Sequence, residues 1–409
     1  MAVIVQLVQG LHFTTTTVKS MATSSPTRWW VASPPCVWGN NFVFNTKLAD
    51  VSAEESYKPL TTPVFGKGVW GMSNDAFRAY VPEIEEETRN YFQRWNNRTS
   101  GRGDLVTAMG ELIINAASRT LMGPEIRGLM DESVPINMFF EWLTLPSYFR
   151  RDSAHRKMRN VFKKVIEERH MLQSLMNQTY KDGTPFIDLD ACHLMIALLM
   201  IGQHTSSTTA TWALLFLAEN PEVVKQLIAE QKDVLGSSDA PLTFDSLKHM
   251  TLLDHVIRET LRLRPPIIMI LRKVLRPLHY PGTDYVIPKG NYLAVSPIAT
   301  QVDEKYYKDP FKFDPSRWEN FVEEETGETV DFGFGKIAGE GARNPNLPFG
   351  AGRHRCIGES FAYVQLKTVI STFLRLYESL TEKGIPGSDF TKMFVQPVLP
   401  VEINYTPRK

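Results

Sequence analysis

The sequence carries no excess of charge, because 45 Lys and Arg residues balance 45 Asp and Glu residues among 409 in all. Without a basic excess, nucleic acid is not predicted as a partner. The only cysteines are Cys36, Cys192 and Cys356, too few for a disulfide framework. They fit a reducing compartment, or a thiol kept for chemistry. No hydrophobic run reaches the about 18 residues of a membrane span, so no transmembrane anchor is predicted.

Hydrophobic residues make up 43% of the chain, which is enough for a sizeable core and excludes a disordered protein. The length alone allows two or three domains or one large one. The first residues lack the basic region of a signal peptide. Residues 1–38 are rich in Thr, Ser and Pro and are predicted to be an irregular N-terminal segment without a recognisable anchor.

A helical periodicity dominates the rest of the chain, so the predicted fold class is mainly α with small β-sheets. The predicted helices are Val81–Trp95, Arg150–Tyr180 as one or two helices, Leu189–Glu219 capped by Asp188, Glu222–Leu235 after Asn220 and Pro221, and Leu252–Leu263. The predicted strands are Ile267–Leu275, Tyr285–Ile287, Tyr292–Ser296 and Val398–Tyr405. The run Leu194–Ile201 in the longest helix is apolar on all sides and is predicted to be buried.

The sharpest motif is the loop from Phe349 to Gly358, whose cysteine is Cys356. Glycines such as Gly350 permit tight turns and a close approach of the backbone to a flat ligand. A helical pattern with the apolar stripe Phe361, Leu366, Ile370, Phe373 and Leu374 follows the loop. The start of that helix would favour the thiolate form of the sulfur. A buried structural thiol is the alternative, but one thiolate without a second ligand at zinc spacing is the pattern of haem.

This loop resembles the haem-binding signature of the cytochrome P-450 monooxygenases. Two further motifs occur in the order of that family: Glu259-Thr-Leu-Arg262 followed by Arg317, and Gly202-Gln-His-Thr205 in the long helix. His354 and the segments Pro63–Lys67 and Pro281–Pro288 resemble the fungal sterol 14α-demethylases in particular. The resemblance implies one P-450 catalytic domain over residues 39–409, with haem between the long central helix and the helix after the cysteine loop.

The resemblance also implies a role for each matching residue. Cys356 would be the axial ligand of haem b. The other cofactor-binding residues would be Phe349, Gly350, Gly358, His354 and Arg272, the last two at the haem propionates. For Arg272, a solvated charge at a strand end is the alternative.

The catalytic residues implied by the resemblance are Thr205, His204 and Gly202. Gly202 and Thr205 would open the long helix beside the bound O2, and Thr205 and His204 would pass protons to it. A Thr205 hydroxyl bonded back to its own helix is the alternative. Glu259, Arg262 and Arg317 would form a buried ion cluster that fixes the cysteine loop. Taken alone, a Glu-x-x-Arg pair is more often a surface helix pair.

Several positions depart from the family. The chain is shortened after Lys67–Val69 and again before Pro135–Asn137, so segments that face the substrate in the family have no counterpart. Ile268 and Met269 stand where the fungal enzymes usually carry His and Ser, and Ile201 replaces a small alanine. These changes predict a more apolar and bulkier cavity. The chain is thus either a divergent paralogue or one shortened by an imperfect gene structure.

The function implied is that of a haem-thiolate monooxygenase that removes a sterol 14α-methyl group. It would use O2 and electrons from NADPH–cytochrome reductase, a flavoprotein, at the cytosolic face of the endoplasmic reticulum membrane, which implies contact with a membrane surface. Three alternatives stay open: oxidation of a secondary-metabolite terpenoid or polyketide, a paralogue that binds sterol or azole ligands without turnover, and a helical scaffold without cofactor.

Overall fold

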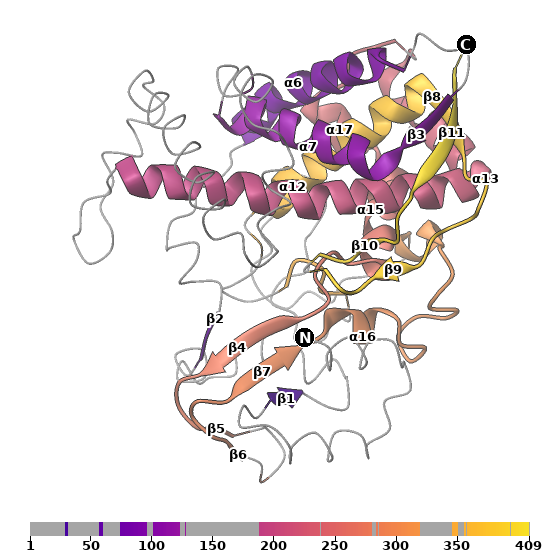
Figure 1. Ribbon diagram of the computed structural model, residues 1–409. Coiled ribbons are helices and arrows are strands. Elements are labelled where there is room, and N and C mark those ends of the chain that lie inside the picture. Colours follow the sequence, from indigo (N-terminus) through magenta and orange to yellow (C-terminus); the bar gives the residue numbers. More distant parts are fainter. Residues whose placement is uncertain are drawn as a thin grey trace.

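The structure is a computed structural model, and it describes residues 29–31, 57–59, 74–95, 101–122, 127, 188–237, 239–279, 284, 286–319, 346–350, 356, 358–392 and 394–408. The predicted helix at 150–180 and both shortened segments lie outside these residues. Helices dominate the part described, and the strands form small sheets, which confirms the predicted fold class (Figure 1). None of the described helices is long and apolar enough to cross a membrane.

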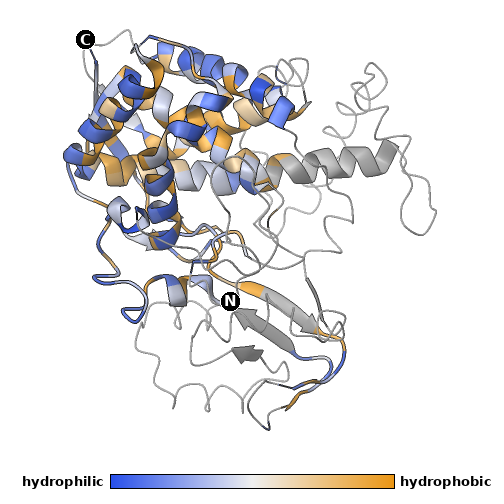
Figure 2. Cartoon of the chain, turned by 180° about the vertical axis from the view of Figure 1, so that it is seen from behind, coloured by the Kyte–Doolittle hydropathy of each residue, from blue (hydrophilic) through white to orange (hydrophobic). Residues whose placement is uncertain are grey.

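The helices are α6 (Asn74–Gln93), α7 (Leu105–Met122), α12 (Asp188–Glu219), α13 (Pro221–Leu235), α14 (Phe244–His249), α15 (Thr251–Leu263), α16 (Pro297–Gln301) and α17 (Glu359–Leu376). Helix α12 crosses the molecule, and α7, α15 and α17 pack against it (Figure 1). Hydrophobic residues concentrate in this helical part (Figure 2). The five predicted stripe residues of α17 are all buried, as expected.

The strands of the first sheet are β1 (Trp29–Val31), β2 (Tyr57–Pro59), β4 (Ile270–Val274) and β7 (Tyr292–Val295), in the order β1-β7-β4-β2. The other strands are β3 (Gly101–Asp104), β5 (Leu278–His279), β6 (Val286–Ile287), β8 (Tyr377–Leu380), β9 (Ser388–Asp389), β10 (Gln396–Pro397) and β11 (Glu402–Pro407). They form a three-stranded sheet in the order β3-β11-β8 and two hairpins, β10-β9 and β5-β6.

Local signals in the sequence set the ends of several helices. Pro221 occupies the first turn of α13, and Gly236 closes that helix with a φ of 72° and an N–H bond to the Lys232 carbonyl. Helix α14 starts with a capping box, in which Thr243 and Ser246 each accept the other's backbone N–H. These features need no tertiary contact, and the two helices of this region that were predicted, α13 and α15, end within one residue of the predicted bounds.

The predicted start of the first helix is wrong. Helix α6 begins at Asn74, not at Val81, and it continues through Pro82. A proline inside a helix removes one hydrogen bond and usually marks a boundary. Here burial outweighs that cost, because Phe77 and Val81 are at most 1% exposed and the Phe77 ring packs on Phe244 with centroids 5.5 Å apart.

The segment expected to be irregular contains one strand. Trp29–Val31 form β1, which pairs in parallel with β7 in the register Trp29 to Tyr292. Two tryptophans followed by a valine are good strand formers, and the open edge of β7 supplies the partner. Residues 101–104 form β3, because β11 offers them an edge to pair with.

A buried carboxylate joins α6 to α17. Glu85 accepts bonds from Arg89 at 2.8 Å, Arg375 at 2.6 Å and the Leu242 backbone N–H at 2.7 Å. Burial alone would raise the pKa of the Glu85 carboxyl. The Leu242 and Arg89 hydrogen bonds and the charge of Arg375 outweigh this effect and lower the pKa below its usual 4.5.

Glu85 therefore makes folding sensitive to acid. Because its pKa is lowered in the folded state, its contribution to stability is complete above pH 4.5 and is lost as the pH falls through the folded-state value. We expect Glu85→Gln to cost about 2 kcal/mol near neutral pH and to flatten the acid limb of stability. Urea unfolding at several pH values measures the loss of stability near neutral pH and its change toward acid. An equal loss of stability at pH 3 and pH 7 would contradict this prediction.

Candidate functional site: a cysteine loop beside the central helix

The cysteine loop ends where α17 begins. Gly358 is the N-cap of α17, and a Cβ added at Gly358 would meet the Cys356 sulfur at 4.0 Å, so the sulfur lies beside the start of the helix. Unbonded N–H groups and the helix dipole at this end favour the thiolate. Cys356 is in no disulfide and is exposed, although cysteine is among the residue types most often buried. The alternative of a buried structural thiol therefore does not describe Cys356.

The backbone of the loop folds back on itself. The Cys356 N–H donates to the Phe349 carbonyl at 2.8 Å, and the Gly350 N–H donates to Leu347 at 3.0 Å. Gly350 has a φ of 70°, a left-handed conformation that favours glycine. The Phe349 ring packs against Tyr363 of α17 with centroids 5.7 Å apart. Cys356 is thus held from both sides, by the turn at 347–350 and by α17.

These residues fit haem. In this kind of site the haem iron binds one cysteine thiolate, and the flat haem needs open space beside the sulfur. Cys356 offers a single exposed sulfur, and among the described residues no group of three His, Cys, Asp or Glu could hold a metal ion by itself. His354 lies outside the described residues. Arg272 is placed only by its backbone, in β4 opposite Leu293 of β7. The roles of both at the propionates stay predictions.

The middle of α12 has an open side. A Cβ at Gly202 would meet no atom within 4 Å, and Ile201 is 39% exposed, in contrast to the predicted burial of the whole run 194–201. Leu199 is fully buried, so the two residues of that run whose side chains are described, Leu199 and Ile201, differ in exposure. His204 and Thr205 follow Ile201 by three and four residues, and they are therefore its neighbours on the helix surface.

The hydroxyl of Thr205 bonds within its own helix. Its Oγ1 donates to the Ile201 carbonyl at 2.8 Å, and the Thr205 carbonyl accepts from the Thr209 hydroxyl at 2.8 Å. The helix is continuous through Gly202. In this geometry the Thr205 oxygen keeps its lone pairs free to accept a hydrogen bond, and it becomes a donor only after the bond to Ile201 breaks.

The residues of the predicted ion cluster lie together. Glu259 and Arg262 are both fully buried. Arg262 donates to both Glu259 oxygens at 2.8 Å, and Arg317 donates to Glu259 at 3.2 Å. Arg262 also donates to the carbonyls of Gln301 and Pro310, both at 2.7 Å. The cluster thus ties α15 to the chain that follows α16.

Sequence reasoning missed one member of this cluster. The indole N–H of Trp318 donates to Glu259 at 3.1 Å, and the Asp314 backbone N–H donates at 3.0 Å. Trp318 directly follows Arg317 in the sequence, and this adjacency was the available signal. With these bonds Glu259 is surrounded by donors, so its buried charge is compensated.

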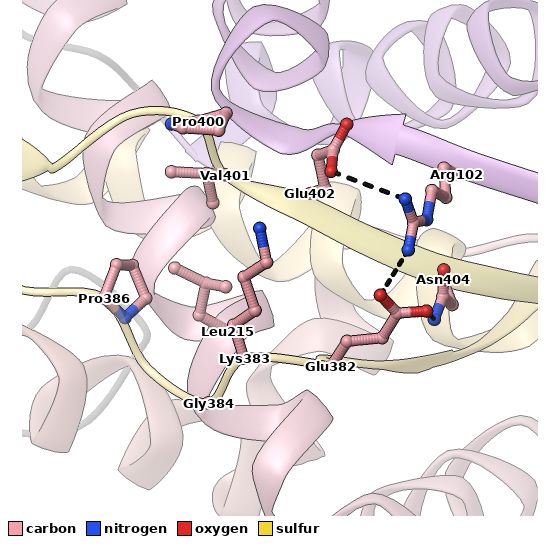
Figure 3. Close-up of a pocket in the computed structure, with 10 residues that line it drawn as sticks. All are labelled: Arg102, Leu215, Glu382, Lys383, Gly384, Pro386, Pro400, Val401, Glu402 and Asn404. Carbon is pink, nitrogen blue, oxygen red and sulfur yellow. Dashed lines mark hydrogen bonds and ion pairs between the residues drawn. The ribbon is translucent and has the colours of Figure 1, made fainter.

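A pocket beside the β3-β11-β8 sheet is not a substrate site. It has a volume of about 110 Å³ and is lined by Arg102, Leu215, Glu382, Lys383, Gly384, Pro386, Pro400, Val401, Glu402 and Asn404 (Figure 3). Arg102 reaches toward the carboxylates of Glu382 and Glu402, which neutralise it. Pockets that hold small molecules are about 300–1,000 Å³, so a sterol does not fit here.

Known proteins are similar to this chain both in sequence and in fold. Residues 148–405 match the family Cytochrome P450. A lanosterol 14-alpha demethylase from Cunninghamella elegans is 42% identical, with 91% of this chain and 81% of that protein aligned. The lanosterol 14-alpha demethylase of Schizosaccharomyces pombe is 41% identical, covering 91% and 83%, and the sterol 14-alpha demethylase of Aspergillus fumigatus is 39% identical, covering 91% and 82%.

Among solved structures, the cyanobacterial CYP120A1 with bound retinoic acid aligns with a TM-score of 0.72, covering 93% of this chain and 89% of that one, at 17% identity. This match shows the fold, and it confirms the P-450 fold predicted from the motifs. The sequence match and the fold match agree. The chain belongs to the cytochrome P450 family of haem-thiolate monooxygenases.

Proposed function

We propose that this chain is a sterol 14α-demethylase, in which Cys356 ligates haem iron. The observation that carries the proposal is the exposed Cys356 thiol beside the N-terminus of α17, held by its N–H bond to Phe349. The relatives with 39–42% identity, which bear the names lanosterol or sterol 14-alpha demethylase, support the choice of substrate class.

The haem of this family supplies the activation of O2 at an iron whose thiolate ligand donates electron density. Each oxidation of the 14α-methyl group takes O2, two electrons and two protons, and the carbon leaves as formic acid. NADPH–cytochrome reductase is the proposed source of electrons. The proposed location is the cytosolic face of the endoplasmic reticulum membrane.

The chain itself orients the cofactor and provides protons. Cys356 presents its sulfur at a fixed place because the turn at Gly350 and the start of α17 constrain its backbone. Thr205 would accept a proton at Oγ1 from solvent or a neighbour and pass its own proton toward the oxygen. The open side at Gly202 and Ile201 provides the space in which that transfer takes place.

In Thr205→Ala, NADPH oxidation should no longer be coupled to product formation. The Thr205 hydroxyl donates to the Ile201 carbonyl of the same helix, so the fold should tolerate the loss. Proton delivery by a placed side chain contributes about 10²–10⁴-fold. We expect a fall in product of about 10²-fold while NADPH oxidation continues and hydrogen peroxide accumulates. Thr205→Ser keeps a hydroxyl and should restore product. Equal product from the Ala and Ser variants would contradict the role of Thr205.

Turnover of a 14α-methyl sterol by the purified chain, with added reductase and NADPH, tests the proposed function. Demethylated sterol and formic acid are the expected products. Another oxidised product from a terpenoid or polyketide would favour secondary metabolism. Sterol binding spectra without product would indicate a binding protein, and failure to hold haem would favour a scaffold. Each of these three results overturns the proposal.

A further inference from the structure

A second segment reaches the open side of α12. The stretch between β9 and β10 is anchored at Val395, whose N–H donates to the Pro266 carbonyl at 2.9 Å and whose carbonyl accepts from the Trp212 indole at 3.4 Å. Val395 is 3% exposed. Because Trp212 belongs to α12 and Pro266 follows α15, Val395 is fixed to two separate parts of the fold. The backbone position of the preceding residue, Phe394, is fixed with it.

The side chain of Phe394 lies on His204. The two rings are stacked, with centroids 5.3 Å apart and planes 20° apart. Aromatic rings attract each other at centroid distances of about 4.5–7 Å when their planes are offset. One face of the imidazole is thereby covered, which restricts rotation of the ring about its Cβ–Cγ bond.

The surroundings of His204 also favour its neutral form. Burial lowers the pKa of its imidazole below the usual 6.5, so the ring is neutral at physiological pH. A neutral imidazole carries one donor and one acceptor nitrogen, and it can take up a proton on one nitrogen while it gives up a proton from the other. Which nitrogens point toward the open side depends on the orientation of the ring.

We infer that Phe394 is a positioning residue: its ring holds the His204 imidazole in the orientation that supplies protons to the open side of α12 next to Thr205. The inference rests on the proposed function, because it concerns proton supply at the same site. A plain packing role for Phe394 makes a different prediction, since any side chain of similar size would then serve.

Three variants separate these two roles. Phe394→Leu keeps an apolar side chain but removes the ring face, and Phe394→Tyr keeps the ring. Phe313→Leu is the matched control, because Phe313 is stacked on Phe216 with centroids 4.6 Å apart, away from His204. Each variant is prepared as haem-loaded holoenzyme, and the Soret band of its reduced carbon monoxide complex reports that the site is intact.

The first measurement is the rate at which diethyl pyrocarbonate acylates His204, followed by peptide mass spectrometry. We expect a severalfold faster reaction in Phe394→Leu and the parent rate in Phe394→Tyr and Phe313→Leu. This readout needs neither sterol nor turnover. It therefore decides the placement of His204 even if the parent demethylates no sterol, which would defeat the proposed function instead.

The second measurement is product formed per NADPH oxidised. In Phe394→Leu the yield of product per NADPH should fall severalfold, and more hydrogen peroxide should form. In Phe394→Tyr the yield should return to that of the parent. In a His204→Ala background Phe394→Leu should cause no further loss, because the two changes act on one element. Equal losses in both backgrounds, or parent behaviour of Phe394→Leu in either measurement, would overturn the inference.

Phe394→Met provides a second variant without a ring, because the flexible Met side chain fills irregular gaps. If both Phe394→Leu and Phe394→Met failed to hold haem, Phe394 would be a structural residue and the inference would be wrong.

Discussion

Cys356→Ser should abolish the thiolate-type Soret band of the reduced carbon monoxide complex and all oxidation of substrate. A serine hydroxyl is not deprotonated at neutral pH and donates far less electron density to iron than a thiolate. The change is nearly isosteric, and Cys356 is exposed, so the apoprotein should still fold. The carbon monoxide difference spectrum, together with turnover, is the measurement.

Cys192→Ala is the control for a general effect of removing a thiol, because Cys192 lies near the start of α12 and not in the cysteine loop. It should retain both the band and activity. If Cys356→Ser kept the thiolate band, or if Cys192→Ala lost it, Cys356 would not be the iron ligand and the proposed function would fail at its first step.

Glu259→Ala should cause the largest loss of stability in the described part of the chain. Removing this carboxylate leaves Arg262 fully buried without its counter-charge and frees the donors of Arg317 and Trp318. Breaking a buried pair in this way costs about 3–5 kcal/mol. We expect the variant to unfold at much lower urea concentration and to lose haem during purification.

Glu222→Ala is the matched control, because Glu222 forms the same kind of pair with Lys225, three residues on, at the surface of α13. Exposed pairs contribute little, so this variant should behave as the parent. Similar urea midpoints for the two variants would show that the cluster around Glu259 does not stabilise the fold as its burial implies.

Much of the helical fold was predictable because its signals are local. The Asn220-Pro221 start and the Gly236 stop of α13, and the apolar stripe of α17, depend on neighbours within a few residues. Helix α7 was not predicted. Its residues are buried on nearly every side, from Leu105 to Ala117, so it lacks the alternation that reveals an amphipathic helix.

Other features depend on contacts that are distant in the sequence. Gly101–Asp104 contain poor strand formers, and they form β3 only because β11 pairs with them. Gly103 lies so close to the Trp95 ring that a Cβ would be 2.4 Å from it, which a sequence pattern does not reveal.

The candidate site also contains residues that local motifs reveal and residues that only distant contacts place. Cys356, Glu259 and Thr205 stand in motifs, and the motifs were sufficient to select them. Phe394 stands in no motif, and it reaches His204 because two hydrogen bonds of Val395 fix the segment between β9 and β10. Residues that position others through tertiary contacts are therefore the part of the site that only the folded chain reveals.

The position of β11 has a consequence for the order of folding. This strand is the central strand of its sheet, between β3 and β8, and the Leu105 N–H at the start of α7 donates to the Val401 carbonyl just before it. The two outer strands come from distant parts of the chain and meet only through β11. The sheet therefore forms late, because each of its pairings with β3 needs a long loop to close first.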